Sequence, residues 1–208
     1  DKRYMADRLV AFHRWGRRVY GMEDPDWSQF EFCSSRVAVD AGVLLEEDYQ
    51  SALRRLLACK TEECPEARDA ALLLLVCYRF GLRGNEARGL TRADWVVNGD
   101  HMVLIVRTNP IRKLKTPGSR RIVPLVFRLE GQEKVLIEER LMRAEGIYGD
   151  AQNGRIFCRD DGSEPDWPRV KRLAISVLKQ ATGNPGSNLH RARHAAANRI
   201  LLSLTGTA

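Results

Sequence analysis

Residues 81–90 read Gly81-Leu82-Arg83-Gly84-Asn85-Glu86-Ala87-Arg88-Gly89-Leu90, and Asp94 follows four positions later. The apolar block at residues 70–78 precedes this stretch and predicts a buried helix that opens at Pro65 and stops at Gly81. Residues 85–90 predict a short helix. Arg83 and Glu86 are three positions apart, and on that spacing alone the ordinary interpretation is an ion pair on a helix surface.

Outward from this stretch, the hydrophobic pattern predicts helices on both sides of a small sheet. Residues 3–20 and 46–60 have helical periodicity, whereas residues 21–35 have the composition of a linker. After Leu90 the period falls to about two, which predicts a hairpin from residues 95–97 and 102–106 and a third strand at residues 121–125. Helical patterns then resume at residues 132–144, 167–181 and 189–204. The fold class expected is α+β, mostly helical with a small three-stranded antiparallel sheet.

The composition is that of a globular protein, with 44% hydrophobic and 29% charged residues among 208. No apolar run approaches the roughly 20 residues that a membrane span needs, and the N-terminus has no signal-peptide pattern. The five cysteines are an odd number at irregular spacings, so neither a disulfide framework nor a zinc pair is indicated. We therefore expect reduced thiols, a cytoplasmic location and no metal site.

The charge distribution favours a polyanionic partner. The formal net charge is +7, and residues 101–128 contain no Asp or Glu. The same segment holds seven basic residues, namely Arg107, Arg112, Lys113, Lys115, Arg120, Arg121 and Arg128. A solvated basic loop is the ordinary interpretation of such a run, but a phosphate backbone is the partner that this concentration of charge suits.

A third signal lies near the start of the last expected helix, in Leu189-His190-Arg191-Ala192-Arg193-His194. His190 and Arg193 are three positions apart and would share a helix face. An exposed basic helix explains this pattern equally well when it is considered alone.

Taken together and in this order, the three signals resemble the tyrosine recombinase (phage integrase) family over residues 44–206. The resemblance implies that Arg83 and Arg193 are the two catalytic arginines, Lys115 the lysine of the hairpin, and His190 the histidine of the third motif. Glu86 and His194 would support them. The basic residues expected to bind DNA are Arg112, Lys113, Arg120, Arg121 and Arg191.

The family's chemistry accounts for these residue types. A tyrosine hydroxyl attacks a DNA phosphodiester and leaves a 3′-phosphotyrosyl link. Two guanidinium groups match the charge and geometry of the phosphate in the transition state. A lysine can protonate the departing 5′-oxygen, and imidazole titrates in a useful range for holding the phosphate or assisting the nucleophile. Because the covalent intermediate conserves the bond energy, no cofactor is expected.

Two departures from the family pattern follow the third motif. Ala192 stands where the family commonly has leucine, and none of the five tyrosines follows Arg193. We therefore expect a catalytic domain truncated before its nucleophilic tyrosine, which binds double-stranded DNA without cutting it. Residues 1–42 would be the end of a core-binding-type helix and a linker, and residues 43–208 the incomplete catalytic domain. The full-length protein is expected to be a homo-tetramer on DNA, and this chain a monomer.

Several alternatives stay open at this point. A non-catalytic DNA-binding protein derived from the same fold would explain the missing tyrosine, and a type IB topoisomerase-like enzyme would use a similar constellation. A basic helical interaction domain would explain the charge alone. The leading hypothesis is a recombinase from a bacterium, phage or other mobile element, active in DNA integration and recombination and associated with the nucleoid.

Overall fold

The computed structural model describes residues 12–13, 16–21, 23, 44–60, 62–98, 101–114, 119–149, 151 and 153–205. The chain divides into two compact units, Asp1–Ala41 and Gly42–Ala208. In the first unit, residues 12–13 and 16–20 are helical, and the remainder of the helix expected at residues 3–20 lies outside the described residues. The assignment of residues 1–42 to a core-binding helix and linker stays a prediction.

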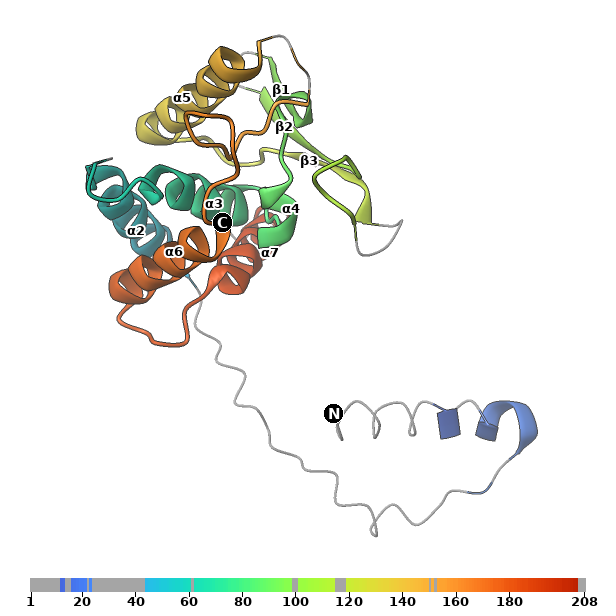
Figure 1. The fold of residues 1–208 in the computed structure, drawn as a ribbon. Coiled ribbons are helices and arrows are strands. Elements are labelled where there is room, and N and C mark those ends of the chain that lie inside the picture. Colours follow the sequence, from blue (N-terminus) through green and yellow to red (C-terminus); the bar gives the residue numbers. More distant parts are fainter. Residues whose placement is uncertain are drawn as a thin grey trace. The chain divides into compact units, whose positions relative to one another are not determined.

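The second unit is mostly helical and contains one three-stranded sheet, which confirms the expected fold class (Figure 1). In chain order, the elements are α2 (Glu46–Ala58), α3 (Ala67–Arg79), α4 (Gly84–Arg88), the 3-10 helix η2 (Arg92–Asp94), β1 (Trp95–Asn98), β2 (His101–Val106), β3 (Arg121–Pro124), α5 (Gly131–Tyr148), α6 (Trp167–Thr182) and α7 (Leu189–Thr205).

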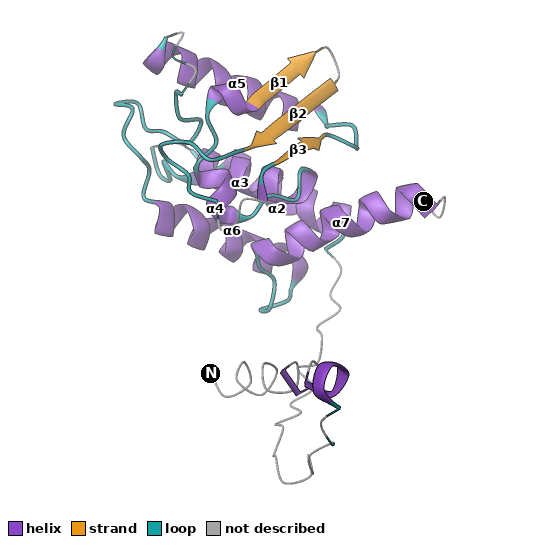
Figure 2. Ribbon diagram, turned by 90° about the vertical axis from the view of Figure 1, so that its right-hand side faces the viewer, coloured by secondary structure: helices purple, strands orange, loops and turns teal. Residues whose placement is uncertain are grey.

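Helix α3 is the centre of the core. It packs against α2, α6 and α7, and its apolar block is buried on every side, as residues 70–78 predict (Figures 1 and 2). Each leucine buried in this way contributes about 1.5–3 kcal/mol relative to an exposed one. The helix begins at Ala67, slightly later than the expected opening at Pro65, because residues 65–66 form a turn. Its C-terminal end carries the stretch at residues 81–90, so the core fixes where that stretch lies.

The sheet has the order β1-β2-β3, with both pairs antiparallel. Trp95 lies opposite Leu104, and Leu104 lies opposite Val123, so the apolar side chains of the three strands share a face. Helix α5 lies beside this sheet in both ribbon views (Figures 1 and 2). Among the described residues, no helix is long and apolar enough to cross a membrane.

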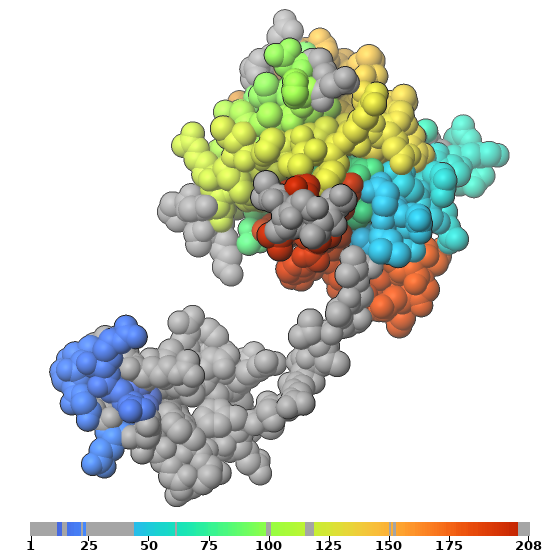
Figure 3. All heavy atoms as spheres, turned by 180° about the vertical axis from the view of Figure 1, so that it is seen from behind, coloured from blue at the N-terminus to red at the C-terminus, as the bar shows by residue number. Residues whose placement is uncertain are grey.

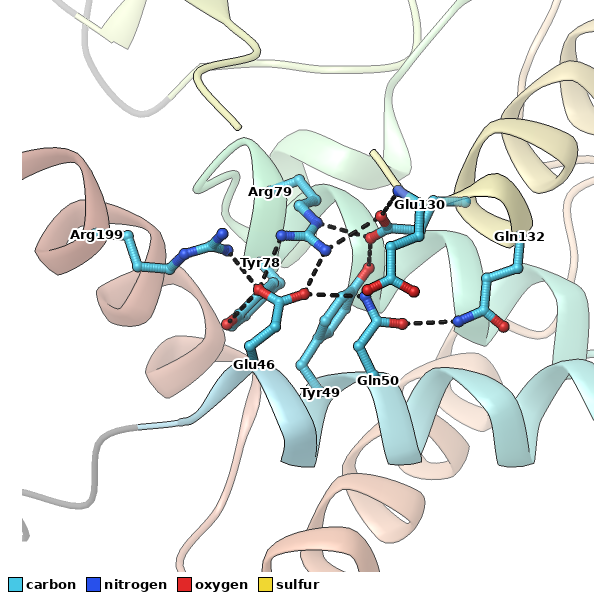
Figure 4. A network of polar contacts seen from close by, with 9 residues as sticks. Glu46, Tyr49, Gln50, Tyr78, Arg79, Glu130, Gln132 and Arg199 are labelled. Atoms are coloured by element: carbon cyan, nitrogen blue, oxygen red, sulfur yellow. Dashed lines mark hydrogen bonds and ion pairs between the residues drawn. The ribbon is translucent and has the colours of Figure 1, made fainter. Parts of the chain in front are cut away.

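A partly buried charged network joins four elements of the second unit (Figure 4). Arg79 of α3 donates from Nε to Oε1 of Glu133 in α5 at 2.7 Å and from Nη1 to Oε2 of Glu46 in α2 at 2.9 Å. The same Glu46 oxygen lies 3.1 Å from Nη1 of Arg199 in α7. From behind, atoms of α7 (red), α2 (light blue) and the segment before α5 (yellow) lie close together on one face (Figure 3). The network therefore holds α7 in a defined position on the core.

Candidate functional site

The carboxylate of Glu86 is the centre of the candidate site. Glu86 is the third residue of α4, and Arg83 is the N-cap, so the backbone N–H of Arg83 donates to Glu86 Oε2 at 2.8 Å. The Arg83 side chain donates from Nη1 to Oε1 at 3.0 Å. This local pairing was expected from the spacing, but the Glu86 side chain is only 7% exposed. It is therefore a buried group and not a member of a surface ion pair.

Two further arginines reach Glu86 from elements distant in the sequence. Arg121, the first residue of β3, donates from Nη1 and Nη2 to both carboxylate oxygens, at 3.0 and 2.7 Å. Arg193 of α7 places Nη1 3.6 Å from Oε2. This nitrogen is buried and has no hydrogen-bond partner among the described residues. Three guanidinium groups thus surround one carboxylate, and the cluster of Arg83, Glu86, Arg121 and Arg193, here called the arginine cluster, has a net charge of +2.

The electrostatics of the arginine cluster favour an anion. Burial by itself would raise the pKa of Glu86, but the hydrogen bonds from Arg121 and Arg83 outweigh it and lower that pKa to about 2. The carboxylate is therefore ionised at neutral pH. Burial and the positive charge of Arg83 lower the pKa of Arg193. Since the arginine side chains are 58%, 30% and 26% exposed for Arg83, Arg121 and Arg193, a phosphate oxygen can approach these cations from solvent.

Close packing between α7 and the end of α3 brings Arg193 to this place. Gly81 has φ +64, a backbone conformation that favours glycine, and a Cβ added there would lie 3.5 Å from the Cβ of Ala196. Ala192 and Ala195 are buried in the same interface. The alanine at position 192 thus fills a tight contact with the core and leaves the polar face of α7 unchanged.

The two histidines of the third motif lie on the exposed side of α7. Asn188 caps the helix by accepting from the backbone N–H groups of His190 and Arg191, at 2.9 and 3.1 Å. The Nε2 atoms of His190 and His194 are 2.9 Å apart, and the two rings meet edge to face. Arg191 points back to Ser187, whose Oγ lies 3.4 Å from Nη1.

Arg112 differs from its expected role as a DNA-binding residue. It is only 3% exposed, and its guanidinium donates to the backbone oxygens of Arg107 and Glu86 at 2.8 Å each and to the Asp94 carboxylate at 3.2 Å. A Cβ added at Gly89 would lie 2.2 Å from the Arg112 Cβ. The expectation is corrected accordingly: three of the five N–H groups of this guanidinium donate to acceptors inside the protein, and its burial keeps the other two away from a phosphate in solvent. Arg112 instead holds α4 and η2 against the chain that follows β2.

The structure assigns different surroundings to the remaining basic residues of the segment 101–128. Lys113 and Arg120 are exposed and lie in the sequence between β2 and β3. Lys115, the expected hairpin lysine, lies outside the described residues. Arg121, expected to contact DNA, is instead bound to Glu86. The structure therefore brings together Arg83, Glu86, Arg121 and Arg193, and it leaves the place of Lys115 a prediction.

Comparison with known proteins finds similar sequences over about two thirds of the chain. No family model matches the chain. It is 37% identical over 136 residues to the tyrosine recombinase XerC of Methylobacterium sp. (strain 4-46) and 34% identical over 137 residues to that of Bradyrhizobium diazoefficiens. Over the matched residues, the chain is therefore similar to tyrosine recombinases. The matched region is 65% of this chain and 38% of each curated relative, so the chain corresponds to well under half of either one.

Solved structures of tyrosine recombinases share the fold. The XerH site-specific recombinase bound to palindromic difH substrate, in a post-cleavage complex, superposes with a TM-score of 0.56 at 18% identity, over 77% of this chain and 42% of that one. A portion of the Tn1549 transposon integrase in complex with transposon right end DNA gives the same TM-score at 16% identity, over 96% of this chain and 64% of that one.

Lys171 lies beside the arginine cluster and is not singled out by the sequence. Lys171 of α6 donates to Oδ1 of Asn85 at 3.0 Å, and its Cε lies 3.5 Å from where a Cβ would stand on Gly84. The ammonium group is thus adjacent to the turn that carries Arg83. Nothing in the spacing between residues 85 and 171 indicates this contact, because it depends on how α6 packs against the core.

The described tyrosines of the second unit are engaged elsewhere. Tyr49 is fully buried and donates to Glu133 at 2.5 Å. Burial raises the pKa of Tyr78 to about 12, and the Tyr78 ring stacks on Tyr49. Tyr148 donates to the backbone oxygen of Gly162 at 2.6 Å. These hydroxyls serve packing and internal hydrogen bonds. The described residues also contain no group of three or more His, Cys, Asp or Glu side chains that could hold a metal ion.

Proposed function

We propose that this chain is the phosphate-binding part of the catalytic domain of a site-specific DNA recombinase, which cleaves and rejoins DNA through a 3′-phosphotyrosyl intermediate. The observation that carries the proposal is the convergence of Arg83, Arg121 and Arg193 on the buried carboxylate of Glu86. A single carboxylate holds three guanidinium groups in place and neutralises only one of them. Such a fixed cationic site suits a phosphate that gains charge in its transition state.

In this proposal Arg83 and Arg193 donate to the non-bridging oxygens of the scissile phosphate. Glu86 and Arg121 orient them, since Arg121 already uses both Nη atoms on the carboxylate. His190 approaches the phosphate from α7, and Lys115 protonates the departing 5′-oxygen. None of the five tyrosines is given the nucleophile's role in this proposal, so these 208 residues bind double-stranded DNA without cutting it.

Duplex binding by the chain tests the role of the arginine cluster. Fluorescence anisotropy with a labelled DNA duplex is measured over a range of salt concentrations for the wild type, Arg83→Ala and Arg193→Ala. Arg159→Ala is the charge-matched control, because Arg159 is exposed and lies beside the start of α3, at the opposite end of that helix from the cluster. We expect both cluster variants to weaken binding more than the control does. Equal losses in all three variants would refute a localised phosphate site and leave only general attraction of a basic protein.

To test the catalytic part of the proposal, the gene that encodes this chain is sequenced beyond the codon for Ala208. A tyrosine codon within a few tens of residues after that for Ala208 allows the longer protein to be expressed and tested for a covalent phosphotyrosyl adduct on a nicked duplex. Formation of the adduct by the wild type but not by Arg193→Ala supports the recombinase assignment. A stop codon directly after Ala208 would instead leave a non-catalytic DNA-binding protein.

A further inference from the structure

The histidine pair of α7 has the geometry of a chelating site. His190 and His194 are four positions apart, so both side chains project from the same face of the helix, one turn apart. Both are exposed, and their Nε2 atoms are 2.9 Å apart. The cap formed by Asn188 fixes the first turn, on which His190 stands.

The separation between the two nitrogens distinguishes between metal geometries. Imidazole nitrogens bind first-row transition ions at about 2.0–2.1 Å. Two such ligands at a right angle, as in square-planar or octahedral coordination, are ~2.9 Å apart, whereas tetrahedral ligands at the same bond length are ~3.4 Å apart. The 2.9 Å separation is that of a hydrogen bond between the two rings, and small rotations of these exposed side chains bring both Nε2 atoms to one ion at the right angle that Ni²⁺ and Cu²⁺ prefer.

We propose that Nε2 of His190 and Nε2 of His194 together bind one Ni²⁺- or Cu²⁺-type divalent ion. Water completes the coordination, because the described residues supply no third His, Cys, Asp or Glu ligand to this pair. In the absence of metal, the Nε2–H group of one ring donates a hydrogen bond to Nε2 of the other ring across the 2.9 Å contact. Binding shifts that proton to Nδ1 of the same ring and leaves both Nε2 lone pairs for the ion.

The surroundings make this site weak and reversible. Arg193 lies on the same helix between the two histidines in sequence, and Arg83 lies across the arginine cluster from it, so a bound cation meets positive charge nearby. With only two protein ligands, the ion exchanges readily with free chelators. A bound ion also occupies both Nε2 atoms, and neither can then contact a phosphate. This last consequence rests on the proposed function, because it depends on the role given to His190.

The test uses the untagged chain and NiCl₂ alone, without DNA. Calorimetric titration is made on the wild type, His190→Ala, His194→Ala and His101→Ala. His101 is a matched control because it is a single exposed histidine on β2. We expect one equivalent of Ni²⁺ to bind to the wild type and to His101→Ala, and each α7 variant to bind at least about tenfold more weakly, since half of the protein ligands are lost.

Two outcomes would overturn the proposal. The first is the absence of saturable Ni²⁺ binding by the wild type, and the second is equal binding by His194→Ala and the wild type. Circular dichroism of each variant separates loss of a ligand from loss of the helix. The Ni²⁺ titration contains no nucleic acid, so a negative result in it does not contradict the proposed phosphate site. In the same way, DNA binding that contradicts the phosphate site does not contradict the metal site.

Discussion

Replacing Glu86 with glutamine tests whether one buried carboxylate organises the arginine cluster. The fall of the Glu86 pKa from 4.5 to about 2 shows how strongly the folded protein favours the ionised form. Each tenfold change in an acid constant is worth about 1.4 kcal/mol, so this fall corresponds to roughly 3 kcal/mol. The bound arginines are partly exposed to solvent, which weakens their attraction, and we expect Glu86→Gln to lower the free energy of unfolding by about 2 kcal/mol at pH 7.

The pH dependence of that loss follows from the sign of the shift. A carboxylate with a lowered pKa in the folded state contributes stability above its ordinary pKa, and this contribution is lost as the pH falls from about 4.5 towards 2. The difference between the wild type and Glu86→Gln should therefore be largest at pH 7, fall by about half near pH 3, and become small only below about pH 2. Urea unfolding followed by circular dichroism at several pH values measures it.

A matched control separates this effect from the loss of an ordinary ion pair. Glu145→Gln removes the partner of Arg92 at an exposed site, where the carboxylate is 3.2 Å from the guanidinium and the glutamate side chain is 53% exposed. Its expected cost is below about 1 kcal/mol. The reasoning is refuted if Glu86→Gln is no more destabilising than this control at pH 7, or if its cost is the same at pH 3 and pH 7.

Three further predictions concern the residues around the arginine cluster. Arg112→Ala should cost about 1–3 kcal/mol in urea unfolding, because it removes one of the two guanidinium groups bound to the buried Asp94 carboxylate and the side-chain donor to the backbone oxygen of Glu86; an unchanged midpoint would contradict the buried role. Gly89→Ala should cost about 1–3 kcal/mol by overpacking against Arg112, whereas Gly131→Ala, with nothing within 4 Å of the added Cβ, should be nearly neutral in the same thermal melts. Lys113→Ala and Arg120→Ala are exposed changes that should each lower the salt dependence of duplex binding by about one released ion without altering the melting temperature; an unchanged slope would place them away from DNA.

The sequence predicts the fold well because its signals are local. The leucines of α3 form a continuous apolar block, and burial on all sides is what such a block requires in the middle of a helical core. The hairpin of β1 and β2 follows from the change of period and from the Asn98-Gly99 turn residues. The observed ends of the strands and the observed start of α3 differ from the predicted ones by one or two residues. The end of an element depends on tertiary contacts that a local sequence pattern does not contain.

The site is predictable only where its contacts are local. Arg83 and Glu86 are neighbours on one short helix, so their pairing follows from spacing. The burial of that pair does not follow, because it depends on Arg121 and Arg193 arriving from two other elements. Arg112 was assigned to DNA for the same reason. Within a basic segment, the sequence does not distinguish a buried arginine from an exposed one. Arg112 is the buried one, and it donates to the backbone oxygens of Glu86 and Arg107.

The network around Arg79 has a consequence for protein engineering. Arg199 of α7 and Glu46 of α2 are 153 positions apart in the sequence, yet they form one ion pair, and Glu46 is shared with Arg79. A chimaera that grafts α7 from a tyrosine recombinase, in order to exchange its histidines and arginine, would remove one of the two guanidinium partners of Glu46 unless the incoming helix also carries an arginine at position 199. The transplantable unit is therefore a helix together with its distant anchor, although the two are separated by most of the second unit in the sequence.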